Sequence, residues 1–310
     1  MKVCCVIVNY NDGDTVMNLV DRITGFKVLE GIVVVDNRST DDSLEKLRSL
    51  EGDKVTVIRG ERNGGYGYGN NLGVQYAVKV MGATHVVIAN PDVEFTERTI
   101  LALGRLFQKH PDLGAAAPVM EDMQYGGLGR GWRLHGFLGE LLVMGPVSRR
   151  LFRRFLNYPE QYYRGKRVVG VGAVHGSMLM VDGKAFLECG GYDEGIFLYQ
   201  EESVLGWRMR TGGYRMAVLM TETYVHRHGT SIIKSCESQM RRQMIRHESV
   251  LYYMKHYLYI NRFQQLAAKV WFGGILAEIW LAGAGKAVIG GVRKGPGRVL
   301  RGRQETGRPV

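Results

Sequence analysis

The sequence lacks the cysteine spacings that mark a zinc site or a disulfide framework. It has four cysteines: Cys4 and Cys5 are adjacent within an apolar run, whereas Cys189 and Cys236 stand alone. This arrangement excludes cysteine-based metal centres and disulfide-stapled folds, so we expect buried thiols in a reducing compartment.

No stretch of the sequence is both long and apolar enough to span a membrane. The most apolar late segment, 270–285, carries Glu278 and is shorter than the ~20 apolar residues that a span needs. Met1-Lys2-Val3 leads directly into an apolar run without the features of a signal peptide. We therefore expect a cytoplasmic protein.

The chain carries an excess of positive charge. Its 310 residues include 41 basic and 30 acidic side chains, for a net charge of +11. Such a balance favours an anionic partner: a phosphate-bearing substrate, a membrane surface or a nucleic acid. No nucleic-acid recognition motif is present, and the charges gather between 120 and 167 and in the C-terminal tail, so no nucleic-acid partner is expected.

Apolar runs that alternate with helical patterns indicate an α/β fold. The runs are 3–8, 32–35, 55–58, 86–89 and 115–119. This alternation predicts a parallel, doubly wound sheet, in which ligands bind outside the carboxyl ends of the strands. Asp36 and Asp92 follow two of these runs. Asp92, directly after Asn90-Pro91, is either a metal-holding carboxylate or a turn acid.

A glycine-rich stretch, 63–71, separates the third and fourth runs. It has neither the dinucleotide-binding nor the P-loop spacing. We expect a loop that feeds a helix near Leu72, either as a seat for phosphate or as a turn without a ligand. Ser39 to Asp42 is expected to cap the helix after the second strand.

Two later motifs could carry chemistry. Glu201 and Glu202 stand at an expected helix start, where they either stabilise the helix dipole or supply a general base. His226 and His228 follow a strand and are either metal ligands or ordinary hydrogen-bonded residues.

Two segments lie outside the strand–helix alternation. Segment 120–167 is rich in arginine, tyrosine and tryptophan, and is expected to be an insertion over the ligand edge of the sheet. Beyond 235 the chain is helical and basic. Its apolar segment suits either an anionic membrane surface or packing on the sheet beside a disordered tail.

Together these stretches, over residues 1–231, resemble glycosyltransferase family 2, the inverting enzymes with the GT-A fold, and within it the rhamnosyltransferase-like and capsule-type members. The resemblance implies a Rossmann-like, mixed but mostly parallel sheet flanked by helices. It implies a catalytic domain over 1–235, with its insertion at about 120–167 on the acceptor side, and a helical extension over 236–310.

The resemblance also implies site residues. Glu202 would be the catalytic base, with Glu201 orienting or replacing it. Asp92 and His226 would hold a divalent Mg²⁺ or Mn²⁺, with His228 a weaker candidate. The nucleotide sugar would be bound by Val8, Asn9, Tyr10, Asp36, Asn63, Gly65, Asn70, Asn90, Gly176 and Ser177.

The sequence departs from the family pattern at three positions. Asn90 replaces the first acid of the metal motif, Glu202 stands where aspartate is commoner, and Val204 replaces another common acid. The implied reaction is transfer of rhamnose or another hexose from a UDP- or dTDP-sugar to a lipid-linked or polysaccharide acceptor in cell-envelope, capsule or O-antigen synthesis. Peripheral contact with the inner face of the membrane would involve the C-terminal region. The alternative is a sugar-nucleotide nucleotidyltransferase, but residues 9–14 lack its glycine-rich, basic signature.

Overall fold

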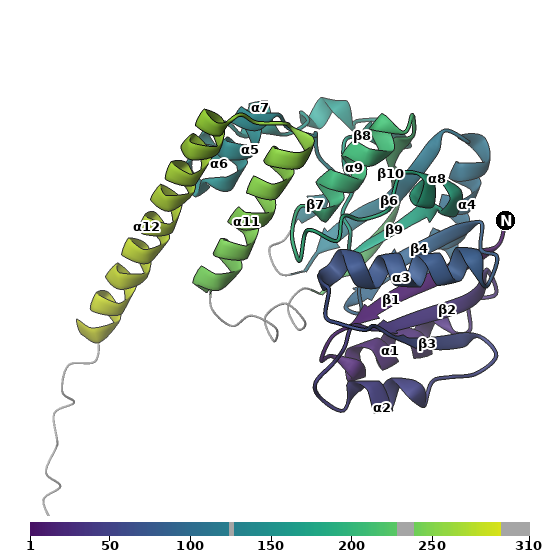
Figure 1. Ribbon diagram of the computed structural model, residues 1–310. Helices are drawn as coiled ribbons and strands as arrows, with labels where there is room; N and C mark the ends of the chain where they lie inside the picture. Colours follow the sequence, from purple (N-terminus) through teal and green to yellow (C-terminus); the bar gives the residue numbers. More distant parts are fainter. Residues whose placement is uncertain (124–126, 228–238, 293–310) are drawn as a thin grey trace, which may run out of the picture.

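The structure, a computed structural model, describes residues 1–123, 127–227 and 239–292. Its centre is one β-sheet with helices on both faces (Figure 1). The strands are β1 (Val3–Asn9), β2 (Leu29–Asp36), β3 (Val55–Arg59), β4 (His85–Ala89), β5 (Val93–Glu94), β6 (Leu113–Asp122), β7 (Gly127–Gly129), β8 (Val168–Val171), β9 (Met178–Asp182) and β10 (Arg215–His226).

Helices fill the connections and the C-terminal part. They are α1 (Gly13–Ile23), α2 (Ser43–Arg48), α3 (Gly65–Lys79), α4 (Glu97–Lys109), α5 (Phe137–Met144), α6 (Pro146–Leu151), α7 (Arg153–Leu156), the 3₁₀ turn η1 (Glu160–Tyr162), α8 (Gly183–Glu188), α9 (Glu201–Thr211), α11 (Gln239–Tyr257) and α12 (Arg262–Val292).

The sheet is mixed, as expected. Its order is β3-β2-β1-β4-β9-β6-β10-β5, with β7 on β6 and β8 on β10. Neighbours among β3, β2, β1 and β4 pair in parallel, as do β6 and β10. The purely parallel arrangement suggested by the strand–helix alternation fails at β9, which pairs antiparallel with both β4 and β6. The alternation stops before β9, so it carried no information on the direction of that strand.

Two apolar layers cover the two faces of the sheet. Successive residues of a strand point to opposite faces, so β1 sends Cys5 and Ile7 into one layer and Cys4 and Val6 into the other. Helices α1, α2 and α4 complete the first layer, and α3, α8 and α9 complete the second. This double covering explains why the inner strands are continuous apolar runs.

The glycine-rich stretch is a helix, not the expected loop. Helix α3 begins at Gly65, seven residues before Leu72. Its glycines allow close packing on the sheet: a Cβ at Gly69 would lie 2.7 Å from Val8, and one at Gly73 would lie 2.4 Å from Val6. The glycines lower the helix propensity of α3, but they allow it to pack closely on β1.

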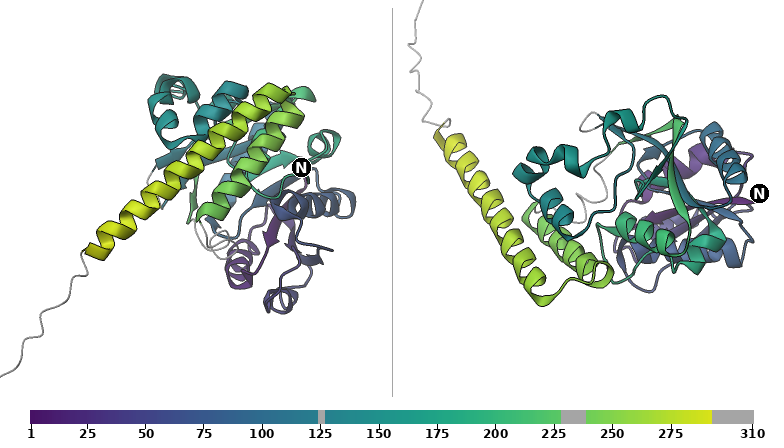
Figure 2. Two further views of the ribbon diagram at one scale, coloured as in Figure 1. Left: turned by 60° about the vertical axis from the view of Figure 1, so that its left-hand side comes forward. Right: turned by 90° about the horizontal axis from the view of Figure 1, so that it is seen from above.

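The C-terminal helices form a layer of their own beside the insertion (Figure 2). Helix α12 packs on α11 and on α5 rather than on the sheet, and the rings of His247 and Phe272 stack 4.5 Å apart. In the described parts of the chain, no helix has the length and apolar character needed to cross a bilayer. The basic tail beyond 292 lies outside the described residues.

We predict that Gly73→Ala lowers the free energy of unfolding by about 1–3 kcal/mol, the usual cost of overpacking. The new methyl group would overlap Val6 and lie 3.0 Å from Val35. Chemical denaturation measures the effect. Gly273→Ala is the matched control, because that helical glycine has open space around it and alanine there should be neutral or mildly stabilising. Equal effects at both positions would contradict the packing explanation.

Candidate active site

A cavity of about 410 Å³ lies beyond the carboxyl end of β4. Asn90 follows β4, Gly176 and Ser177 precede β9, and Glu201 and Glu202 begin α9; all five line the cavity. The Asn90 N–H donates to the Ser177 carbonyl at 2.8 Å, which joins the first two segments. Five of the predicted site residues are thus brought together from three distant parts of the chain.

The two glutamates differ in surroundings. Glu201 is only 4% exposed, and its Oε1 has no hydrogen-bond partner among the described residues. Glu202 is half-buried, and its Oε1 accepts from the Gly176 N–H at 3.3 Å. Burial raises the pKa of both carboxyls, and the charge of Glu202 raises that of Glu201 further. Backbone N–H groups lower the pKa of both carboxyls, but Arg246 acts on Glu202 alone, which favours the negative charge of the pair on Glu202.

A strained turn sets the start of α9. Tyr199 and Gln200 both have left-handed backbone angles, with φ of 72° at each. Such residues cost on the order of 1–3 kcal/mol each and persist where neighbours hold them. Here the Gln200 side chain donates to Glu140 at 2.9 Å, and the Ser249 hydroxyl of α11 donates to the Leu198 carbonyl at 2.7 Å. The turn lets α9 begin with both glutamates at the cavity.

Asp92 and His226 lie against each other. His226 Nε2 is 3.2 Å from Asp92 Oδ1, and the Arg227 N–H donates to the Asp92 carbonyl at 3.0 Å. Two ligands bound at about 2.1 Å and at right angles around one divalent ion lie about 3 Å apart, so this pair fits shared coordination. Within the described ranges, no group of three or more metal-ligating side chains forms, and His228 lies outside them.

Tyr224 connects the Asp92 pair with the glutamates. Its buried hydroxyl lies 2.6 Å from Ser177 Oγ. Burial raises the pKa of Tyr224, and the charges of Glu202 and Asp92 add to the rise. Asp92 lies outside the residues that line the cavity, but both carboxylates are near enough to act on the same phenol.

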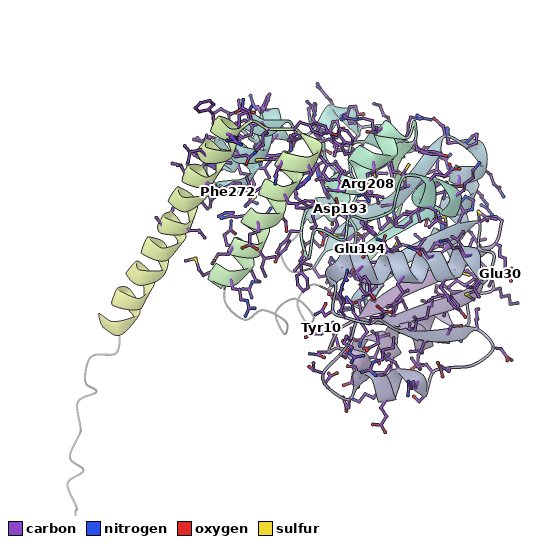
Figure 3. The ribbon with its side chains drawn as sticks, viewed as in Figure 1. Tyr10, Glu30, Asp193, Glu194, Arg208 and Phe272 are labelled. Carbon is purple, nitrogen blue, oxygen red and sulfur yellow. The ribbon has the colours of Figure 1, made fainter. Side chains whose placement is uncertain are left out.

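The other predicted nucleotide-binding residues lie at the ends of β1 and β2. Asn9 and Asp36 are fully buried: Asn9 Nδ2 donates to Asp36 Oδ1 at 2.9 Å and to Ser39 Oγ at 3.0 Å. Ser39 therefore does not cap α2. Within the expected capping segment, Asp41 Oδ1 accepts from the Ser43 N–H at 3.0 Å, while the Asp42 side chain makes no cap bond. Val8 and Tyr10 are half-buried at this edge, with Tyr10 at the sheet end near α3 (Figure 3).

Asn63, Gly65 and Asn70 form the start of α3. Asn63 Oδ1 accepts from the Gly65 N–H at 3.2 Å, and the buried Asn70 amide donates to the Tyr66 carbonyl at 2.9 Å. Their contacts are internal to the protein, so their role toward a nucleotide remains a prediction. Tyr66 was missed by the sequence analysis: its hydroxyl donates to the Gly176 carbonyl at 2.7 Å, and its side chain reaches the cavity.

Sequence reasoning also missed Glu140. This side chain is 4% exposed, lies in the cavity wall and accepts from Gln200. Burial raises its pKa to about 7. The sequence does contain a signal for Glu140: it is the one acid in the apolar run 137–144, where burial of an unpaired charge would be unfavourable. Trp132 and Arg149 from the insertion, and Arg246 from α11, also line the cavity.

A polar cluster fixes α11 to α9. Asp193 accepts from the Tyr257 hydroxyl at 2.5 Å and forms an ion pair with Arg208 at 3.3 Å (Figure 3). Arg208 also donates to the carbonyls of Gly190 and Gly191. Helix α11 is therefore held in the position in which its Arg246 lines the cavity.

The sheet and the position of this site define the GT-A fold of glycosyltransferases. In support, the mannosyltransferase of Pyrobaculum calidifontis, solved with GDP-Man and Mn²⁺, superposes with a TM-score of 0.55 over 93% of this chain and 80% of that one, at 15% identity. A family model, glycosyl transferase family 2, matches residues 4–181. The chain belongs to that family, which confirms the predicted family and fold.

Two curated relatives share lower similarity over part of their length. A low-salt glycan biosynthesis hexosyltransferase of Haloferax volcanii, Agl10, is 27% identical over 66% of this chain and 60% of its own. An N-acetylglucosaminyl-diphospho-decaprenol L-rhamnosyltransferase of Mycobacterium tuberculosis is 26% identical over 63% of this chain and 66% of its own. The match thus spans less than two thirds of either relative.

We predict that Glu140→Gln flattens the pH dependence of stability. The folded-state pKa of about 7 exceeds the ordinary carboxyl value of 4.5, so the folded protein holds this proton more tightly. Its contribution to stability is full below pH 4.5 and is lost as the pH rises to 7. The variant should gain about 3 kcal/mol relative to wild type between pH 5 and 8, since one pKa unit is about 1.4 kcal/mol.

Urea unfolding at both pH values measures the change. Glu51→Gln, at an exposed position, is the control and should show no such gain. A gain at Glu140 that is the same at pH 5 and pH 8 would show that the carboxyl does not titrate differently on folding.

Proposed function

We propose that this chain is an inverting glycosyltransferase. It moves a sugar, rhamnose or another hexose, from a UDP- or dTDP-linked donor to a hydroxyl of a lipid-linked or polysaccharide acceptor used in cell-envelope synthesis. The observation that carries the proposal is the half-buried Glu202 carboxylate, which shares one cavity with Asn90 at the end of β4. Family membership favours this activity over the alternative of a sugar-nucleotide nucleotidyltransferase.

Glu202 has the properties of a general base. An acceptor hydroxyl has a pKa far above neutrality, so attack requires a base within hydrogen-bond reach. The raised pKa of Glu202 makes it a stronger base than an exposed carboxylate, while the Gly176 N–H fixes one of its oxygens. The buried Glu201, which keeps its proton while Glu202 is charged, would orient its neighbour.

One displacement accounts for the reaction. The acceptor oxygen forms a bond to the anomeric carbon as the carbon–oxygen bond to the diphosphate breaks. The hydroxyl proton passes to Glu202, and the electron pair leaves with the nucleoside diphosphate. Attack opposite the leaving group inverts the anomeric centre, and no covalent enzyme intermediate is needed.

Asp92 and His226 are the residues that would hold a divalent cation. Their 3.2 Å separation and their oxygen and nitrogen donors suit Mg²⁺ or Mn²⁺ with further ligands from the donor diphosphate. A bound cation would supply positive charge against the leaving diphosphate. Asn90, which replaces an acid of the motif, leaves Asp92 as the carboxylate at this strand end.

Exposed apolar side chains support contact with a membrane surface. Phe155 on α7 is 60% exposed, and Phe263 and Val270 on α12 are 86% and 68% exposed. Arg150 on α6 and Arg153 and Arg154, which precede Phe155 on α7, are also exposed. Apolar groups flanked by arginines suit a bilayer that carries anionic lipids.

We predict that Glu202→Gln lowers the rate of sugar transfer by at least about 100-fold, the usual minimum contribution of a general base. Binding of the donor should remain within about twofold, since the amide keeps the shape of the side chain. A thermal-shift panel of nucleotide sugars identifies the donor. Release of nucleoside diphosphate in the presence of a lipid extract then gives the rate.

The matched control is Glu201→Gln, which should retain more activity than Glu202→Gln. Wild-type activity should fall as the pH drops through the raised pKa of the pair, because protonation removes the base. A fully active Glu202→Gln variant would transfer the role to Glu201 or to another group.

We predict that Asp92→Ala abolishes the stabilisation that a nucleotide sugar gives only together with Mn²⁺. Loss of the carboxylate leaves His226 as the remaining described ligand of the pair. The melting temperature with donor, with and without the metal, measures this effect. Asp21→Ala, on the exposed face of α1, serves as the control. If the metal-dependent shift persists in Asp92→Ala, the cation is held elsewhere.

A further inference from the structure

Arg246 is a cation at the cavity, near the acids Glu140 and Glu202 but ion-paired with neither. It extends from α11 and is half-buried, yet it makes no ion pair or hydrogen bond to any residue that the structure describes. The nearby acid Glu140 binds the Gln200 amide instead. Burial and the like charge of Arg149 lower the pKa of Arg246. Two arginines from separate elements therefore line one cavity, and neither forms an ion pair with a residue that the structure describes.

Arg149 and Arg246 line the cavity, whereas the metal-site candidates Asp92 and His226 do not. Arg149 lies on α6 in the insertion, whereas Asp92 and His226 lie at β5 and β10. Besides Arg149, the groups that act electrostatically on Arg246 are Tyr199, Glu140 and Glu202. The first two belong to the wall made by the strained turn and the insertion. An anion bound by these arginines would therefore lie in the same cavity as Glu202.

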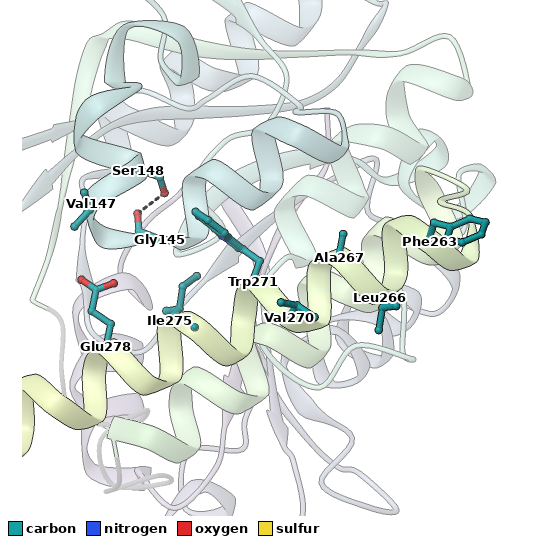
Figure 4. A pocket seen from close by; sticks show the side chains of 11 residues that line it. Gly145, Val147, Ser148, Phe263, Leu266, Ala267, Val270, Trp271, Ile275 and Glu278 are labelled. Carbon is teal, nitrogen blue, oxygen red and sulfur yellow. Dashed lines mark hydrogen bonds between the residues drawn. The ribbon is translucent and has the colours of Figure 1, made fainter.

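An apolar groove lies between α6 and α12, next to the part of α6 that carries Arg149. Its volume is about 600 Å³, and Val147, Leu266, Val270 and Trp271 are among its lining residues (Figure 4). Leu266 is 62% exposed. The groove and the cavity meet at the α5–α6 turn: Val143 and Arg149 line the cavity, while Gly145 and Val147 line the groove. The apolar groove and the arginine-lined cavity are therefore neighbours.

We infer that Arg149 and Arg246 bind the phosphate or diphosphate of an amphiphilic acceptor, and that the groove between α6 and α12 holds its hydrocarbon chain. The inference rests on the proposed function, since it names the acceptor of that site. Arginine binds phosphate through paired, charge-assisted hydrogen bonds, and an apolar groove removes hydrocarbon from water. The acceptor class is a single-chain lipid phosphate, with its sugar hydroxyl toward Glu202.

The test measures binding of farnesyl diphosphate and of inorganic pyrophosphate by calorimetry, in EDTA and without donor. Arg149→Gln and Arg246→Gln should each lower the affinity for both ligands about tenfold or more, as expected for loss of charged hydrogen bonds. Arg246→Lys should restore part of the affinity. Arg150→Gln, beside Arg149 and outside the cavity lining, is the control and should bind as wild type.

A second pair of variants tests the groove. Leu266→Gln and Val270→Gln should weaken farnesyl diphosphate severalfold and leave pyrophosphate unchanged; Leu101→Gln, exposed on α4, is their control. If farnesyl diphosphate binds wild type no more tightly than pyrophosphate, the groove assignment is wrong. If the arginine variants bind pyrophosphate as well as wild type, the anion site is wrong.

Asp92→Ala separates this inference from the proposed function. In EDTA it should leave farnesyl diphosphate binding unchanged, and a loss would place the diphosphate on the donor side and overturn the inference. If the arginine variants bind the donor with metal as wild type does and also bind farnesyl diphosphate as wild type does, the acceptor site is refuted and the proposed function stands. Failure of every nucleotide sugar to bind wild type would refute the transferase itself.

Discussion

The burial of two adjacent carboxyls at the start of α9 is the constraint on which the site depends. Charging both in a partly dry cavity is unfavourable, so the surroundings must decide which one carries the charge. The Gly176 N–H and the charge of Arg246 favour Glu202, whereas Glu201 Oε1 is buried without a partner. Neighbouring residues of one type thus acquire different protonation, as the proposed role of Glu202 as a base requires.

That arrangement requires the C-terminal extension. The left-handed turn at Tyr199 and Gln200 is held from outside α9, by Glu140 of the insertion and by Ser249 of α11. The Asp193–Arg208–Tyr257 cluster keeps α11 against α9. The helices after 238 are therefore part of the site's architecture, because they support the turn and contribute Arg246 to the cavity.

The sequence predicted the features that depend on local pattern. Strand positions followed from apolar runs that are buried on both faces, and the family followed from motifs that end those strands. The proximity of Asp92 to His226, which are far apart in the chain, agrees with the motif order. Residues that act through distant contacts gave weaker signals. The glycines of α3 looked like a loop, because their purpose is contact with Val6 and Val8 on another element.

The ends of β1 and β2 and the arginine-lined wall of the cavity differ in how their polar groups are satisfied. At the proposed donor edge, Asn9, Asp36 and Asn70 are buried and their polar groups bond within the protein, which fixes the strand ends. Arg149 and Arg246, by contrast, form no ion pair with a described residue, and they lie near an exposed apolar groove. A preorganised edge suits one constant ligand part, such as a nucleotide. Cations without an ion-pair partner beside an apolar groove gain stability when an amphiphile binds, so on our proposal this side selects the acceptor.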